Sequence, residues 1–158
     1  SDSSEVHIEL RDKVDIEGVY LTLDAFLDSL GEGEPEMLPA GEESVTYAWE
    51  EELGSWAPYF GWESMTIRGI FPHMHEFGQT LRVDVDTDGQ GYGCAADVPS
   101  WDFNWQLQYF LEQPLTLNEL GKIRVTCGYN TEAAEGPVLP GWGTGNEMCL
   151  VGLFMTPE

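Results

Sequence analysis

The stretch WDFNWQLQY, residues 101–109, alternates large apolar side chains with polar ones at every second position. Because successive side chains of a β-strand point to opposite faces of the sheet, this period predicts a strand with one buried and one solvated face. The apolar face comprises Trp101, Phe103, Trp105, Leu107 and Tyr109, and the polar face Asp102, Asn104, Gln106 and Gln108. The alternation favours a β-sheet protein over a helical one.

Short β-rich runs separated by Gly, Pro, Asn and Asp recur on both sides of this stretch, and no long amphipathic helix is evident. This punctuation predicts an all-β sandwich. The expected strands are Val19–Leu23, Val45–Trp49, Met65–Phe71, Gln79–Asp86, Trp101–Leu111, Lys122–Tyr129 and Met148–Met155. A short helix is expected over residues 24–30, followed by a loop over residues 31–43.

The length and composition of the chain predict a single domain. Its 158 residues are 42% hydrophobic and 12% aromatic, which is ample for a buried core. We find no internal repeat and no linker that separates two domains. We expect residues 1–15 to form a lead-in strand or a flexible acidic segment, and residues 16–158 to form the β-sandwich.

Six basic residues against 29 acidic ones give the chain a formal net charge of −23 at pH 7. Such a charge repels nucleic acid and anionic lipid, so neither is expected as a partner. An ordinary solvated acidic surface explains the charge, and a specific cationic partner is the alternative. No run of about 18 apolar residues occurs, so no membrane insertion is expected. The polar start SDSSE contains no apolar leader, so any export signal is expected to have been removed or to lie outside this sequence.

Two histidines in PHMHEFG, residues 72–78, are candidate metal ligands. Side chains at positions i and i+2 of a strand emerge on one face roughly 7 Å apart, so His73 and His75 can chelate together while Met74 points the other way. Two neutral imidazoles suit copper, zinc, nickel or iron. The alternative is a pair of ordinary histidines with local hydrogen bonds.

A third candidate ligand is Met148, in GWGTGNEMC, residues 141–149. A methionine at the start of an apolar strand is usually a core residue, and that alternative stays open. As a soft ligand beside His73 and His75, however, its thioether favours Cu(I), while the imidazoles can still hold Cu(II). The three side chains therefore predict a redox-active copper site.

Three cysteines, Cys94, Cys127 and Cys149, fit no two-pair zinc pattern. One disulfide and one free thiol is the simplest arrangement. A bridge between Cys127 and Cys149 would close a loop of roughly twenty residues, contribute about 3 kcal/mol and hold Met148 in place. Two buried thiols or two thiolate ligands are the alternatives. Cys94 then remains as a buried apolar residue or a dimer-forming thiol.

A different metal is suggested by DVDTDG, residues 84–89, in which Asp84, Asp86 and Asp88 alternate as in a calcium-binding loop. The helix-loop-helix version also needs a Glu at the twelfth loop position, where this chain has Ala95. A strand with Asp84 and Asp86 on its solvent face, ending in an Asp-Gly turn, is the simpler interpretation.

Four segments occur in an order that resembles a known family. They are PHMHEFGQTLRV (72–83), WDFNWQLQYF (101–110), KIRVTCGYNT (122–131) and WGTGNEMC (142–149). They resemble the C-terminal domain of the copper type II, ascorbate-dependent monooxygenases, which include dopamine β-monooxygenase and the peptide-amidating enzyme. The resemblance extends from about residue 19 to about residue 154.

The resemblance implies a jelly-roll-like β-sandwich with one copper ion held by His73, His75 and Met148. It also implies a disulfide between Cys127 and Cys149. In this family, copper activates dioxygen to abstract hydrogen from a substrate C–H bond, hydroxylation follows, and ascorbate supplies electrons.

The chain departs from the family in its partner domain and its substrate anchors. The family enzymes hold a second copper on three histidines of a preceding domain, whereas the only other histidine here is His7. A separate electron-transfer copper domain or a small reductant is therefore the expected partner. Phe71, Leu150 and Gly152 replace the Arg, Asn and Tyr with which the peptide-amidating enzymes bind a carboxylate, so the expected substrate is an unidentified small molecule and not a peptide.

The leading hypothesis is a copper monooxygenase domain, with Glu76 or Glu147 orienting an imidazole and Trp142 lining a substrate surface. The alternative is a non-catalytic copper-binding or copper-carrier module. A third hypothesis is an adhesion or assembly domain with a relic site and no copper affinity. The expected disulfide and the resemblance imply an extracytoplasmic location, whether periplasmic, cell-surface or secreted.

Overall fold

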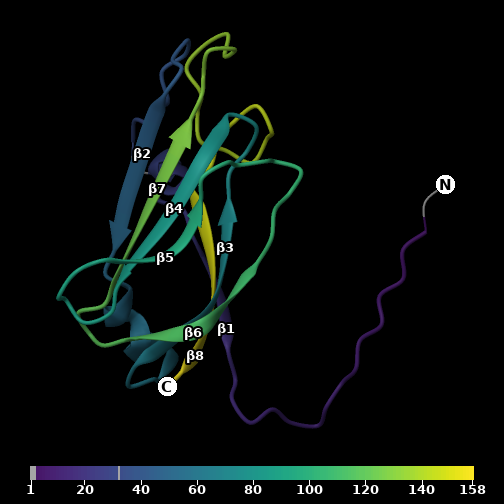
Figure 1. Ribbon diagram of the computed structural model, residues 1–158, viewed down its shortest axis with the longest axis vertical. Helices are drawn as coiled ribbons and strands as arrows, with labels where there is room; N and C mark the ends of the chain where they lie inside the picture. The colour runs from purple at the N-terminus through teal and green to yellow at the C-terminus, as the bar shows by residue number, and fades with distance from the viewer. Residues whose placement is uncertain (1–2, 32) are drawn as a thin grey trace.

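A computed structural model describes residues 3–31 and 33–158. Residues 1–2 of the expected N-terminal segment and position 32 of the expected loop lie outside the described residues. The chain forms two four-stranded antiparallel sheets that pack face to face (Figure 1). The strands are β1 (Val19–Leu23), β2 (Val45–Glu51), β3 (Met65–His73), β4 (Gly78–Asp86), β5 (Gly93–Val98), β6 (Tyr109–Leu117), β7 (Lys122–Tyr129) and β8 (Leu150–Pro157).

The strand order is that of a jelly roll. One sheet has the order β1-β8-β3-β6 and the other β2-β7-β4-β5. Antiparallel pairs therefore form between β1 and β8, β2 and β7, β3 and β6, and β4 and β5. This pairing is what results when one long hairpin with four strands in each arm is wrapped into a sandwich. The predicted all-β, jelly-roll-like fold is confirmed.

The core fills the space between the two sheets. Strand β7 shows its origin best, because every second residue of KIRVTCGY is buried. The buried residues are Ile123, Val125, Cys127 and Tyr129. A disulfide joins Cys127 to Cys149, the residue before β8, and so links the two sheets across the core. Cys94 on edge strand β5 is a free, exposed thiol.

The expected strand Trp101–Leu111 is wrong over most of its length, because β6 begins only at Tyr109. A local turn replaces its first part. The Trp105 N–H donates to the Asp102 carbonyl at 2.9 Å, and the Asp102 carboxylate accepts from the Asn104 N–H at 2.9 Å. Asp and Asn form such turns in competition with a sheet ladder. Strand β5 was not expected, because GCAADV lacks the β-branched and aromatic alternation of a strand.

Two helical turns, α1 (Ala25–Asp28) and η1 (Ser29–Gly31), form where the short helix was expected. Asp24 caps α1 by accepting from the Leu27 N–H at 3.1 Å. A further 3-10 helix, η2 (Leu53–Phe60), was not expected. Residues 3–18 run outside both sheets and away from the sandwich in Figure 1. In the described part of the chain, no helix has the length and apolar character needed to cross a membrane.

Candidate metal centre

A β-bulge in β3 determines which way the two histidines point. The register of β3 with both β6 and β8 shifts between Ile67 and Gly69. Before the bulge, odd-numbered residues such as Ile67 point into the core. After the bulge, even-numbered residues such as Met74 do so. His73 and His75 consequently lie on the outer face of the sheet, opposite to Met74, as their spacing predicts. Bulges commonly re-aim side chains in this way next to functional sites.

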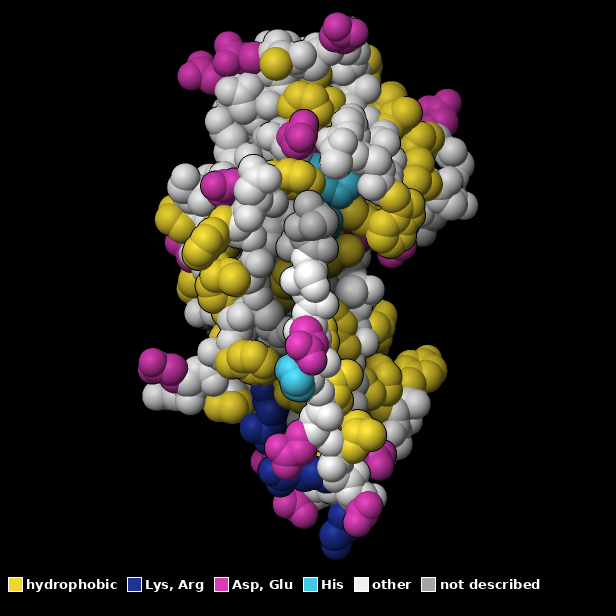
Figure 2. All heavy atoms as spheres, turned by 90° about the vertical axis from the view of Figure 1, so that its right-hand side faces the viewer, with side chains coloured by type: hydrophobic (Ala, Val, Ile, Leu, Met, Phe, Trp, Pro, Cys, Tyr) yellow, Lys and Arg dark blue, Asp and Glu magenta, His cyan; other side chains and the backbone are white. Residues whose placement is uncertain are grey.

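The two imidazoles lie next to each other at the end of β3. The ring centroids of His73 and His75 are 5.1 Å apart, with the ring planes at 86°. Phe71 stacks on His73 at 6.1 Å, and Phe103 meets His75 edge-on at 6.0 Å. His73 is half-buried and His75 is 5% exposed. In Figure 2, histidine side chains (cyan) are visible in the upper part of this face between hydrophobic side chains (yellow). The pair is thus shielded but reachable.

Both imidazoles are held through Nδ1 by carbonyl oxygens. Nδ1 of His73 lies 2.6 Å from Oε1 of Gln106, and Nδ1 of His75 lies 3.0 Å from the Asn146 carbonyl. The Gln106 amide donates in turn to the Phe103 carbonyl at 2.7 Å, which fixes its oxygen toward His73. Because both partners are acceptors, each Nδ1 holds the proton and donates. Each Nε2 therefore presents a lone pair, the arrangement typical of metal-ligating histidines.

The protonation of His73 also suits a ligand. Burial lowers the pKa of the His73 imidazole, and the neighbouring His75 lowers it further, whereas the hydrogen bond to Gln106 opposes the shift. A lowered pKa means that His73 is neutral at neutral pH. Only the neutral imidazole has a lone pair to give to a metal ion.

A buried carboxylate ties the end of β3 to the segment that precedes β8. Glu147 is fully buried, and its Oε2 accepts from the N–H groups of His75 at 2.9 Å and Met148 at 3.1 Å. Its Oε1 accepts from the Phe77 N–H at 2.7 Å. Burial raises the pKa of Glu147, and the three N–H donors oppose that shift. This one side chain therefore sets the spacing between the histidine pair and Met148.

Met148 lies near His75 through its backbone. The ladder between β3 and β8 ends at the pair His73 and Leu150, and beyond it Oε2 of Glu147 accepts from the N–H groups of both His75 and Met148. The side chain of Cys149, the neighbour of Met148, enters the core. Met148 is 1% exposed yet stands apart from the hydrophobic core cluster. The backbone of Met148 is thus held next to that of His75, and its thioether as a third ligand stays a prediction.

Three buried side chains hold the backbone at Met148 and Cys149. The Tyr129 hydroxyl donates to the Met148 carbonyl at 2.8 Å, and the Trp49 indole donates to the Cys149 carbonyl at 2.8 Å. The Cys149 N–H donates to Oδ1 of Asp24 at 3.3 Å. Burial raises the pKa of Asp24 to about 6, and its Oδ2 has no hydrogen-bond partner. The loop-to-strand junction is therefore rigidly supported from the core side.

The structure gives no support to a calcium site at residues 84–89. Among the described residues, no three His, Cys, Asp or Glu side chains are grouped so that they could hold a metal ion. Asp84 pairs with Arg82 at 2.9 Å, which leaves the calcium interpretation of DVDTDG without support. The Asp86 carboxylate accepts from the N–H groups of Asp88, Gly89, Gln90 and Gly91. The motif is a strand that ends in a turn.

The expectation that Glu76 or Glu147 orients an imidazole is wrong. Glu76 is exposed, and Glu147 binds the backbone N–H of His75 and not its ring. The rings are oriented by Gln106 and Asn146, which the sequence reasoning missed. The sequence placed Gln106 only among the polar residues of the 101–109 stretch, which gave no sign of this role. Trp142 is 79% exposed.

Fold and site together define a class of protein. It is a jelly-roll domain in which carbonyl oxygens accept from Nδ1 of both histidines of a His-x-His pair, and in which a methionine near the pair precedes a disulfide-bonded cysteine. The chain belongs to the copper type II ascorbate-dependent monooxygenase family, because the model of that family's C-terminal domain matches residues 57–155.

Animal relatives agree with this assignment. The chain is 27% identical over 126 residues to DBH-like monooxygenase protein 1 of Gallus gallus, covering 80% of this chain and 20% of that protein. It is 28% identical over 109 residues to the Mus musculus protein of the same name, covering 69% of this chain and 17% of the relative. A match to putative DBH-like monooxygenase protein 2 of Homo sapiens has 27% identity over 128 residues, and covers 77% of this chain and 25% of that protein. The chain therefore spans a quarter or less of the length of these relatives.

Proposed function

We propose that this domain binds one copper ion through Nε2 of His73, Nε2 of His75 and the thioether of Met148, and acts as the catalytic half of a monooxygenase. The reaction would be hydroxylation of a C–H bond of a small organic substrate by dioxygen. The observation that supports this most is the hydrogen bonding of both Nδ1 atoms to carbonyl oxygens, which leaves the two Nε2 lone pairs free for a metal ion. Met148 would supply the thioether, since Glu147 holds its backbone N–H together with that of His75.

The donor set fits copper better than zinc or a hard cation. Imidazoles bind both oxidation states of copper, and a thioether favours Cu(I). Copper, when bound, supplies one-electron redox chemistry and the activation of dioxygen. The chain itself keeps both imidazoles in the ligating tautomer through Gln106 and Asn146, and keeps the two ligand segments together through Glu147. Phe71 and Phe103 cover the rings and limit access of water.

Electrons would come from outside the domain. The third histidine, His7, lies on the exposed N-terminal segment next to Glu5, far along the chain from the pair. We propose ascorbate, or a separate electron-transfer copper domain, as the donor. The disulfide between Cys127 and Cys149 favours an extracytoplasmic location, where such bonds persist.

The substrate is proposed to be a small molecule without a carboxylate anchor. Phe71, Leu150 and Gly152 share the outer face with the histidines, and none of them can pair with an anion. Tyr20 lies over Gly152, because a Cβ built on this glycine would lie 2.2 Å from the Tyr20 hydroxyl oxygen. This surface is apolar and aromatic. It offers packing, not charge, to a substrate.

The test is oxygen consumption by the copper-loaded chain with ascorbate and a panel of small C–H substrates. The proposal expects consumption that rises with a substrate and yields a hydroxylated product containing oxygen from labelled dioxygen. His75→Ala should abolish the reaction, and His7→Ala should leave it unchanged. Tight Cu(I) binding without any turnover, with ascorbate or with an added copper electron-transfer domain, would instead establish the copper-carrier alternative.

A further inference from the structure

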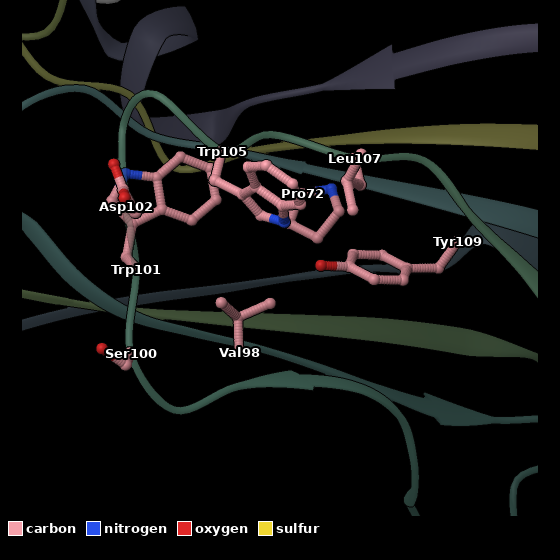
Figure 3. A pocket seen from close by; sticks show the side chains of 8 residues that line it. All are labelled: Pro72, Val98, Ser100, Trp101, Asp102, Trp105, Leu107 and Tyr109. Carbon is pink, nitrogen blue, oxygen red and sulfur yellow. The ribbon is translucent and has the colours of Figure 1, made fainter.

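A hollow of about 430 Å³ opens at the edge of the sandwich, beside the 101–108 loop. Figure 3 shows the rings of Trp101 and Trp105 along one side, Val98 opposite them, and the Tyr109 hydroxyl pointing toward the space between. Val98 ends β5 and Tyr109 begins β6, so the hollow lies between the edge strands of the two sheets. Its volume falls within the range of about 300–1,000 Å³ typical of small-molecule sites.

The aromatic walls are positioned by hydrogen bonds within the protein. The Trp101 indole N–H donates to the His75 carbonyl at 3.2 Å, and the Trp101 backbone N–H donates to the Gln79 carbonyl at 2.7 Å. The turn closed by the Trp105 N–H and the Asp102 carbonyl keeps both residues in the lining, and Figure 3 shows the Asp102 carboxylate next to the Trp101 ring. Trp105 is nevertheless 70% exposed and Tyr109 is 40% exposed. Large aromatic surfaces are thus held open at the mouth of a hollow, which is typical of a binding site.

The chemistry of the walls selects for a cation. Aromatic faces attract positive charge through their quadrupoles, and the Asp102 carboxylate at the rim adds a formal negative charge. Of the described residues that line the hollow, none is Lys or Arg. The net charge of −23 favours cations further. An anionic ligand is therefore excluded.

Few polar groups face the hollow, and this decides the kind of cation. The polar groups of the lining side chains are the hydroxyls of Ser100 and Tyr109, the Asp102 carboxylate and two indole N–H groups, of which that of Trp101 already donates to the His75 carbonyl. A sugar, or a primary ammonium with three N–H donors, would need more partners than these. A cation with apolar substituents needs fewer, because its methyl groups pack against the rings. We propose that this hollow is a binding site for a methylated ammonium cation, held by Trp101, Trp105 and Tyr109 with Asp102 at the rim.

None of the proposed copper ligands lines the hollow, so binding in it does not require copper. Titration of the metal-free chain with choline, followed by tryptophan fluorescence and by calorimetry, therefore tests it directly. The expected result is saturable binding at least about tenfold tighter than that of dimethylbutanol, the uncharged carbon isostere of choline. Equal affinity for the two compounds would overturn the proposal and show an apolar pocket. Binding of glucose in preference to choline, or no saturation up to about 100 mM choline, would overturn it as well.

Two variants and one control test the assignment of residues. Trp105→Ala removes a largely exposed ring and should weaken choline binding by about tenfold or more. Asp102→Asn keeps an oxygen for the Asn104 N–H but removes the charge, and should weaken binding several-fold. Tyr59→Ala, which removes an exposed aromatic ring outside the hollow, should leave choline binding unchanged. Unchanged melting temperatures verify the fold of each variant, and full choline affinity in folded Trp105→Ala would contradict the proposal.

Discussion

At the scale of single residues, the orientation of His73 depends on Gln106. Replacing Gln106 by Leu removes the acceptor of the Nδ1 proton, so the ring can turn and exchange tautomers. We expect copper affinity to fall by about 10–100-fold, the range seen when such supporting groups are removed. Stability should change little, because Gln106 is only partly buried. Competition with a copper chelator measures the affinity, and the neighbouring exposed Gln108→Leu is the matched control. Equal affinities for both variants would contradict this role.

Glu147 has a different role, because it supports the backbone and touches neither imidazole ring. In Glu147→Gln, an NH₂ group replaces one of the two carboxylate oxygens. This NH₂ group must face backbone N–H donors, either those of His75 and Met148 or that of Phe77, with which it cannot form a hydrogen bond. A buried unsatisfied group of this kind should lower the free energy of unfolding by about 1–3 kcal/mol. Urea unfolding at pH 7 measures the change. The exposed Glu76→Gln should unfold at the same urea concentration as the parent, and the account fails if Glu147→Gln does too.

At the scale of elements, the disulfide fastens β7 to the start of β8. The two cysteines are 22 residues apart, and a closed loop of that length reduces the entropy of the unfolded chain. The double variant Cys127→Ala/Cys149→Ala should lose about 3 kcal/mol of stability by the chain-entropy model. Thermal unfolding with Cys94→Ala as the control measures this, since Cys94 is exposed and unbonded. A double variant as stable as the parent would mean that packing alone holds the two sheets.

The junction of β1 and α1 should make stability depend on pH. Burial raises the pKa of Asp24 to about 6 in the folded protein, against an ordinary value of 3.8. Between these values the folded state binds more protons than the unfolded state, so stability falls as pH rises from about 4 to about 6 and stays lower above. The fall should be on the order of 2–3 kcal/mol.

Asp24→Asn keeps the oxygen that accepts from Leu27 and Cys149 but cannot ionise. The stability of this variant should not fall as the pH rises from about 4 to about 6, and the variant should be more stable than the parent at pH 7. Urea unfolding at pH 4, 5, 6 and 7 compares the two proteins. A variant with the same pH dependence as the parent would show that Asp24 is not the cause.

How far the sequence predicts the elements depends on whether local pattern and tertiary structure agree. Lys122–Tyr129 was predicted with its observed bounds, because its alternation matches its burial. Trp101–Leu111 was not, because an Asx turn at Asp102 overrides the alternation. The His73 and Met148 segments were identifiable as motifs. Gln106 and Asn146 were not, since they meet the histidines only through contacts 33 and 71 residues apart in the chain.

At the scale of the whole molecule, charge and topology act together. The net charge of −23 attracts cations to the protein surface, and acidic side chains (magenta) are scattered over the face shown in Figure 2. The jelly-roll fold then determines where the ligands for a soft metal ion come together. The bulge in β3 turns the two histidines outward, the disulfide turns Cys149 inward, and Glu147 holds the backbone of Met148 next to that of His75. Copper binding is therefore expected to be specific to one site within a generally cation-attracting protein.

Calorimetric copper titration of the intact chain and of His75→Ala tests this claim most directly, with His7→Ala as the control. The account predicts one copper ion per chain for the parent and for His7→Ala, and at least about 100-fold weaker binding for His75→Ala. It also predicts that Met148→Leu weakens Cu(I) binding more than Cu(II) binding, since the thioether is the soft ligand. Copper binding of equal strength and stoichiometry in the parent and in His75→Ala would contradict the account.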